Sequence, residues 1–149
     1  MTDRSSCRTL MDSSFAPTAP TQPAIEAGSA GITLATISLT LLDTSTNPNK
    51  ASDCQAAVNL LNKSTIDKGV KMASDAAFNL AAQLLGAELN IVAGAGACPA
   101  AVTAINQGQA LLGAIHFDGK THLKMSTAQL TQANGFAATL DKYNNDLLC

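Results

Sequence analysis

The apolar run from Met72 to Ala93 constrains the fold more than any other stretch of the sequence. Its apolar residues recur at steps of three and four, the spacing that places side chains on one face of an α-helix. The face comprises Ala77, Leu80, Leu84, Ala87 and Ile91, widened by Ala73, Ala81, Leu85 and Val92. A helix with so wide an apolar face must be covered on more than one side. We predict an N-cap at Ser74 and a stop at Gly94 and Gly96.

Two capping-box patterns precede this long helix. Ser52 and Gln55 form the first, which predicts a short helix over residues 53–62. Ser64 and Asp67 form the second, but Gly69 follows closely and limits the helix to a turn or two.

Two further helices are predicted after the long one. Pro99 opens the first, at the position where its missing N–H costs nothing, and Ser126 caps the second, which runs to about Asn145. The predicted inward residues are Val102, Ile105, Leu112 and Ile115 in the first helix and Leu130, Ala133, Ala137, Leu140 and either Tyr143 or Asn144 in the second. The short connections predict a mainly α fold, a three-to-four-helix antiparallel bundle over residues 51–149.

Glycines inside these helices need a structural reason, because each costs about 1 kcal/mol relative to alanine. Gly108 and Gly113 lie in the helix that Pro99 opens, and Gly86 and Gly135 lie in its neighbours. We interpret all four as points of close approach between helices.

Residues 1–50 are interpreted as an extended N-terminal arm. Its prolines between Phe15 and Pro23 favour a polyproline-like segment or disorder. Between residues 31 and 44, apolar residues alternate with Thr and Ser, which predicts one β-strand with a bulge at residues 35–36. The apolar residues of this strand are Ile32, Leu34, Ile37, Leu39 and Leu41. A helix over the same residues would leave Leu34, Ile37 and Leu41 outside its apolar face.

The backbone of this strand needs hydrogen-bonding partners, and the sequence offers no second strand of similar quality. Three arrangements remain open: pairing with the short segment 8–11, exposure, or pairing with another copy of the protein. In the third arrangement the five apolar residues of the strand become subunit contacts.

The polar surface is unusually poor in charge. Only 13% of residues are charged, against about 25% in an average domain, while 46% are hydrophobic. A net charge of −2 gives no electrostatic basis for binding nucleic acid. No run of 18 apolar residues is present, so membrane insertion is not expected.

Four cysteines, Cys7, Cys54, Cys98 and Cys149, indicate two disulfides and an oxidising compartment. None belongs to a Cys-x-x-Cys pair, which disfavours zinc and thioredoxin-like sites. The alternative is four buried free thiols. No apolar segment follows Met1–Arg4, so a signal peptide is not recognisable there; a removed leader, another export route or a longer precursor would account for that.

The bundle predicts how the cysteines pair. Cys98 begins one helix and Cys149 follows the end of its antiparallel neighbour, so both lie at the same end. A bridge between them closes a loop of about 50 residues and contributes about 3–4 kcal/mol in the chain-entropy model. By exclusion Cys7 pairs with Cys54, within one chain or between two chains.

Two segments, 62–90 and 136–149, resemble a helical module found near the C-termini of secreted bacterial surface proteins. In that module a "QLL-A-LN" helix, here Gln83–Asn90, precedes a cysteine-headed helix and an "LDxYNNxxLC" tail, here Leu140–Cys149. The similarity covers about residues 52–149. It implies an extracellular structural or attachment module without catalytic residues to carry over.

Few residues form a constellation that could carry chemistry. His116, Asp118 and His122 could hold a metal, but their spacing matches no established site, and Asp118-Gly119 is typical of a turn. No Ser-His-acid pattern has a recognisable context, and Pro99 disfavours a phosphate site after Gly94 and Gly96. We therefore predict no metal, no cofactor and no enzymatic activity.

These observations favour an extracellular or cell-surface structural protein. The first hypothesis is a self-assembling filament or surface-layer subunit, linked to other copies of itself through its N-terminal arm. The alternative is a monomeric secreted attachment or binding module.

Overall fold

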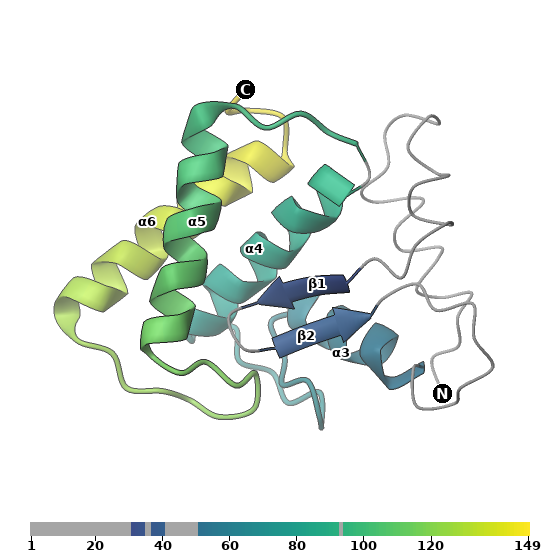
Figure 1. The fold of residues 1–149 in the computed structure, drawn as a ribbon. Helices are drawn as coiled ribbons and strands as arrows, with labels where there is room; N and C mark the ends of the chain where they lie inside the picture. The colour runs from purple at the N-terminus through teal and green to yellow at the C-terminus, as the bar shows by residue number, and fades with distance from the viewer. Residues whose placement is uncertain (1–30, 35–36, 41–50, 93) are drawn as a thin grey trace.

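A computed structural model describes residues 31–34, 37–40, 51–92 and 94–149 (Figure 1). The elements in chain order are strands β1 (Gly31–Leu34) and β2 (Ile37–Thr40) and helices α3 (Ala51–Leu61), α4 (Ala76–Val92), α5 (Pro99–Ala114) and α6 (Thr127–Asn144). The described part is mainly helical, which confirms the predicted α bundle.

Helices α4, α5 and α6 pack against one another, and α3 packs against α4. Figure 1 shows that α4 and α6 run in the same direction, whereas α5 runs in the opposite direction. This is the predicted up-down-up order. The largest fully buried side chains of the core include Leu80, Leu84 and Leu85 of α4, and Phe78 meets Phe117 edge to face with ring centres 5.1 Å apart.

The faces that α5 and α6 bury differ in part from the predicted ones. In α5 the buried residues are Ala101, Ala104, Gly108, Leu111 and Leu112. Val102, predicted to point inward, is 43% exposed, and Leu130 of α6 is 40% exposed. Small side chains allow the helix axes to come close, so Ala101, Ala104 and Gly108 take the place of Val102 in the first part of the buried face, and Leu111 and Leu112 complete it.

Only one of the glycine predictions that can be checked is confirmed. A methyl group added to Gly108 would lie 3.4 Å from Leu80 Cδ1, so α5 contacts α4 closely at this point. Gly113 and Gly135 have no neighbouring atom within 4 Å of such a methyl group. Close helix approach therefore does not explain those two glycines.

The N-terminal caps are only partly as predicted. Ser126 and Gln129 form the capping box of α6. The cap of α4 is Asp75, one residue after the predicted Ser74, because its Oδ1 accepts hydrogen bonds from the N–H groups of Ala77 and Phe78. α3 begins at Ala51, so Ser52 lies inside the helix and not at the predicted N-cap, and Gln55 Nε2 donates to Asn59 Oδ1.

Segment 64–72 is a loop with a single helical turn, in which Gly69 N–H donates to the Thr65 carbonyl, within the predicted limit of a turn or two. Thr65 N–H donates to the Val70 carbonyl, Val70 N–H donates to Thr65 Oγ1, and Ser64 pairs with Lys71 as an isolated bridge. The left-handed backbone of Gly69, with φ of 66°, closes the turn before a helix can extend.

All four helices end in the same hydrogen-bonded arrangement, the Schellman motif. The residue after the C-cap has a left-handed backbone in each case. That residue is Lys63, Gly94, His116 or Asp146, with φ between 55° and 98°. Gly94 ends α4 as predicted, whereas the other three positions hold residues that adopt this conformation at a cost.

The prediction of a single strand over residues 31–44 is wrong. β1 and β2 pair antiparallel within the chain, with Ile32 opposite Leu39 and Leu34 opposite Ile37. The two short strands satisfy each other's backbone hydrogen-bonding groups, so the break in alternation falls between paired strands and not inside one strand. The hairpin lies beside α3 and α4 (Figure 1).

Candidate functional site

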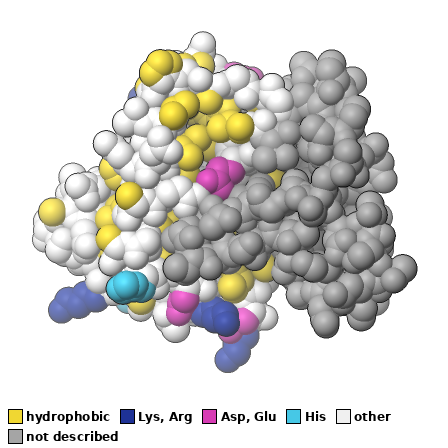
Figure 2. Space-filling model, viewed as in Figure 1, with side chains coloured by type: hydrophobic (Ala, Val, Ile, Leu, Met, Phe, Trp, Pro, Cys, Tyr) yellow, Lys and Arg dark blue, Asp and Glu magenta, His cyan; other side chains and the backbone are white. Residues whose placement is uncertain are grey.

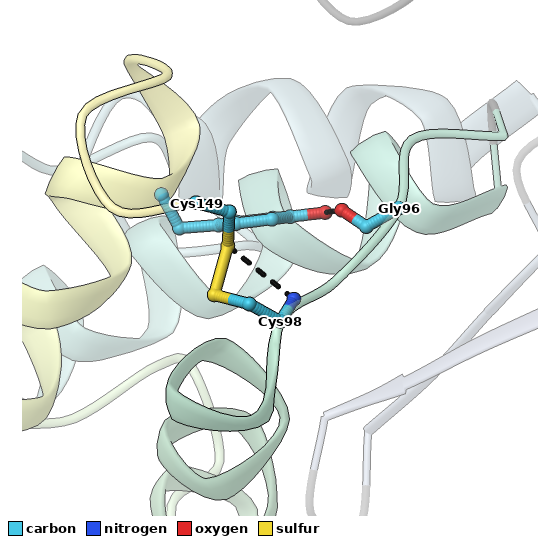
Figure 3. Close-up of a disulfide and its surroundings, with 4 residues drawn as sticks. Gly96, Cys98 and Cys149 are labelled. Carbon is cyan, nitrogen blue, oxygen red and sulfur yellow. Dashed lines mark hydrogen bonds between the residues drawn. A yellow bond between two sulfur atoms is a disulfide. The ribbon is translucent and has the colours of Figure 1, made fainter.

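A disulfide ties the last residue of the chain to the start of α5, as predicted. Cys98 and Cys149 are bonded with their Cα atoms 5.7 Å apart (Figure 3). Cys98 N–H donates to Cys149 Sγ, and the Tyr143 hydroxyl donates to the Gly96 carbonyl at 3.0 Å. Burial, and then the Asp146 carboxylate, raises the pKa of Tyr143, so this hydroxyl keeps the proton that it donates. We call this region the disulfide end.

Side-chain amides join α4 to α6 next to the disulfide. Asn144 Nδ2 donates to both the backbone carbonyl and Oε1 of Gln83. Asn90 Nδ2 donates to Asn144 Oδ1 at 3.0 Å, and Gln83 Nε2 donates to Asp141 Oδ1. These four residues lie in segments 83–90 and 140–149 of the chain. Their observed role is to hold the disulfide end together.

Several predicted site residues cannot be placed. Cys7 lies outside the described residues, and the side chain of Cys54 is not described, so their predicted bond stays a prediction. The same holds for the subunit-contact side chains of the hairpin, since only its backbone is described. Leu41 lies outside the described residues altogether.

The three residues considered for a metal do not converge. His116 occupies the left-handed position after α5 and is exposed. Asp118 closes a turn, accepting from the N–H groups of Lys120 and Thr121 and from the Thr121 hydroxyl. Partial burial acts to raise the pKa of Asp118, but these hydrogen bonds outweigh it and lower the pKa. His122 contacts Asp75 instead.

The Asp75–His122 pair was not predicted from the sequence. His122 Nδ1 and Asp75 Oδ2 share a hydrogen bond. The His122 side chain is 69% exposed, whereas that of Asp75 is only 4% exposed. The pair fastens the loop after α5 to the start of α4. Together with the Asp118 turn and the Ser126 capping box it forms what we call the polar end.

A hollow of about 340 Å³ adjoins this pair, lined also by Ser74, Asn79 and Lys124. No hydrogen bond joins Ser74 to His122 in the described part of the chain, so a Ser-His-Asp relay is not assembled. Both carboxylate oxygens of Asp75 have a structural role. Oδ1 caps α4 by accepting from the Ala77 N–H, and Oδ2 is hydrogen-bonded to His122.

Glu88 is a partly buried carboxyl between α4 and α5. Gln109 Nε2 donates to its Oε1, and its Oε2 is buried without a hydrogen-bond partner. Burial raises the pKa of Glu88 to about 7, although the Gln109 amide acts to lower it. A protonated carboxyl is the form that such an environment favours.

Two neighbouring hollows follow the line between α5 and α6. Their volumes are about 540 and 410 Å³, and both are lined by Gln107, Gln132 and Phe136. Because they share these residues, they form one groove that reaches from Pro99 to Ala114 along α5. We call it the α5–α6 groove.

Charge is distributed unevenly over the described residues. No Lys, Arg, His, Asp or Glu lines the α5–α6 groove. Figure 2 shows basic, histidine and acidic side chains gathered mainly along the lower edge, whereas the surface over α5 is white and yellow. The groove is therefore the largest uncharged concave surface that the described hollows provide.

Within the described ranges no three His, Cys, Asp or Glu side chains lie close enough to hold a metal ion, and no helix is long and apolar enough to cross a membrane. Comparison with known proteins gives no match to a family model, to a curated protein or to a solved structure.

Proposed function

We propose that this chain is an extracellular attachment module without catalytic activity, held in shape by disulfides. The observation that carries the proposal is the Cys98–Cys149 bond, which fixes the chain end to the bundle. Bonds of this kind persist in oxidising environments outside the cytoplasm. The low content of charged residues and the absence of an assembled catalytic relay among the described side chains also support it.

The resemblance to a module of secreted bacterial surface proteins supports the same location. The residues that carry it include Gln83, Asn90 and Asn144, which join α4 to α6, and Cys149, which the disulfide ties to the start of α5. That is a structural reason for motif and disulfide to occur together.

Self-assembly through the N-terminal arm is the second candidate function. Intrachain pairing of β1 with β2 removes the earlier reason for strand exchange, which was a strand without a partner. What still favours assembly is the hairpin itself: no third strand covers its outer edges among the described residues, and such edges can add strands of another copy.

Surface exposure on intact cells tests the first proposal. In the organism that makes the protein, we expect protease added to intact cells to remove it, or the culture medium to contain it. A cytoplasmic marker should resist the same treatment. Recovery of the protein only after lysis, together with the marker, would contradict an extracellular location.

Light scattering separates the two candidates. A monomer at micromolar concentration is expected for the attachment module. Filaments or a defined oligomer would favour assembly, and deletion of residues 31–44 should then abolish them while far-UV circular dichroism keeps its helical signal. Assembly that survives the deletion would exclude the hairpin as the link.

A further inference from the structure

The α5–α6 groove is uncharged over its whole length. Its residues are alanine, glycine, threonine, glutamine, leucine, proline and one phenylalanine. A charged ligand would lose hydration there without meeting an opposite charge, which disfavours anionic and cationic polymers alike. The groove is therefore complementary to a neutral partner.

Polar groups in the groove are available to a ligand. The side chains of Thr103, Gln107 and Gln132 make no hydrogen bond to other described residues, and all three are exposed. Each amide offers two donors and an acceptor, and the hydroxyl offers both. Hydroxyl groups of a ligand also donate and accept, so such a ligand can satisfy every one of these groups.

Phe136 lies where the two hollows meet. It is partly buried and packs against the core, so its position is fixed. Next to it Gly135 contributes no side chain, and a methyl group added there would meet nothing within 4 Å. An apolar ring bordered by open space and amides fits a ligand with apolar C–H faces and hydroxyl edges.

From this geometry we propose that the α5–α6 groove binds a neutral polysaccharide strand. Sugar rings combine the required features: no charge, hydroxyl edges and apolar faces. The groove spans α5 from Pro99 to Ala114, about 24 Å at 1.5 Å per residue, so it suits a chain of rings better than a single sugar. This inference rests on the proposed attachment function and names its partner class.

Affinity electrophoresis of the full chain tests the inference. Three neutral polysaccharides serve as probes (hydroxyethyl cellulose, laminarin and glycol chitin), with anionic alginate and cationic chitosan as counter-probes. We expect at least one neutral polysaccharide to retard the protein and alginate to have a much smaller effect. Retardation by none of the three, or equal retardation by alginate, would overturn the proposal.

Two tryptophan variants locate the binding. Gly135→Trp fills the groove, whereas Gly113→Trp places the same side chain at another helical glycine with open space, outside the groove lining. Both should keep the helical circular dichroism signal. We expect Gly135→Trp and Phe136→Ala to weaken binding about tenfold or more and Gly113→Trp to change it by less than about twofold. Equal affinities of the two tryptophan variants would exclude the groove.

The same variants distinguish other occupants. If Gly135→Trp abolishes self-association seen by light scattering and polysaccharide binding is absent, the groove holds a second copy and the proposal fails. A protein exposed at the cell surface that binds no polysaccharide would contradict this inference and leave the attachment function standing. Recovery only from the cytoplasm would contradict the attachment function itself.

Discussion

At the disulfide end of the α4–α5–α6 unit a covalent bond joins the helices, whereas at the polar end the same helices are joined only by non-covalent contacts. Cys98 and Cys149 make the bond, and a hydrogen bond between the side chains of Gln83 and Asn144 also joins α4 to α6. The opposite end depends on Asp75, which caps α4 and also holds His122. The structure thus fixes residue 149 covalently to the start of α5 and holds the loop after α5 by hydrogen bonds.

Removal of the Cys98–Cys149 disulfide should cause the largest loss in the free energy of unfolding. Replacing Cys98 and Cys149 by serine frees a chain end and removes a cross-link between residues 51 positions apart. We expect the free energy of unfolding to fall by about 3–4 kcal/mol in the chain-entropy model. Urea denaturation monitored by circular dichroism measures it. A loss below about 1 kcal/mol would show that the two ends depend equally on non-covalent contacts.

Asp75 should be the most important single residue of the polar end. Asp75→Ala removes the α4 cap and the partner of His122, so we expect a loss of about 2 kcal/mol. His122→Ala removes only the contact of an exposed ring and should cost about 0.5 kcal/mol. Thermal unfolding of both variants provides the comparison. Equal losses would mean that the histidine contact, and not the helix cap, is what matters at this end.

Glu88, between α4 and α5, makes stability depend on pH between about 4.5 and 7. Its pKa of about 7 in the folded protein exceeds the ordinary value of 4.5, so the folded state binds more protons between these values. The free energy of unfolding should therefore fall as pH rises from 4.5 to above 7. Because the side chain is partly exposed, we expect a fall of about 1–2 kcal/mol.

Glu88→Gln should flatten this trend, as measured by urea denaturation at several pH values. Asp118→Asn is the matched control. The pKa of Asp118 is lowered, so its contribution is present above its ordinary value of 3.8 and is lost only as pH falls further. The Asn variant should keep the decline between pH 4.5 and 7. A decline that persists in Glu88→Gln would assign the effect to another group.

The smallest changes in the free energy of unfolding are expected at two helix C-termini, one at each end of the α4–α5–α6 unit. His116 follows α5 at the polar end and Asp146 follows α6 at the disulfide end, both with left-handed backbone. Glycine adopts this conformation without strain, so each replacement by glycine should raise the free energy of unfolding by about 0.5–1 kcal/mol. Chemical denaturation checks both. A gain at only one end would show that the disulfide changes how the chain tolerates backbone strain.

The two ends also differ in how far the sequence predicts them. Cysteine positions at a helix start and at the chain end were enough to predict the Cys98–Cys149 pair. The Asp75–His122 contact could not be predicted, because it joins residues 47 positions apart whose types fit any exposed turn. Helix existence followed from apolar spacing, but the inward face of α5 followed only in part, since alanines gain burial only once the neighbouring helices are in place.

The N-terminal strands and the α5–α6 groove were likewise predicted from the sequence only in part or not at all. Alternation over residues 31–44 indicated β structure, but one long strand and two short strands that pair with each other share that pattern. The α5–α6 groove has no sequence signal at all. It results from short side chains on one helix facing Gly135 on the next.

The redox state of the protein in its native setting tests the central claim most directly. Thiols are blocked with an alkylating reagent during isolation from the producing organism, without reductant, and the digest is analysed by mass spectrometry. The account predicts a peptide pair joined through Cys98 and Cys149, and both residues protected from alkylation. Alkylated Cys98 and Cys149 in the native protein would contradict a disulfide-closed, extracellular module.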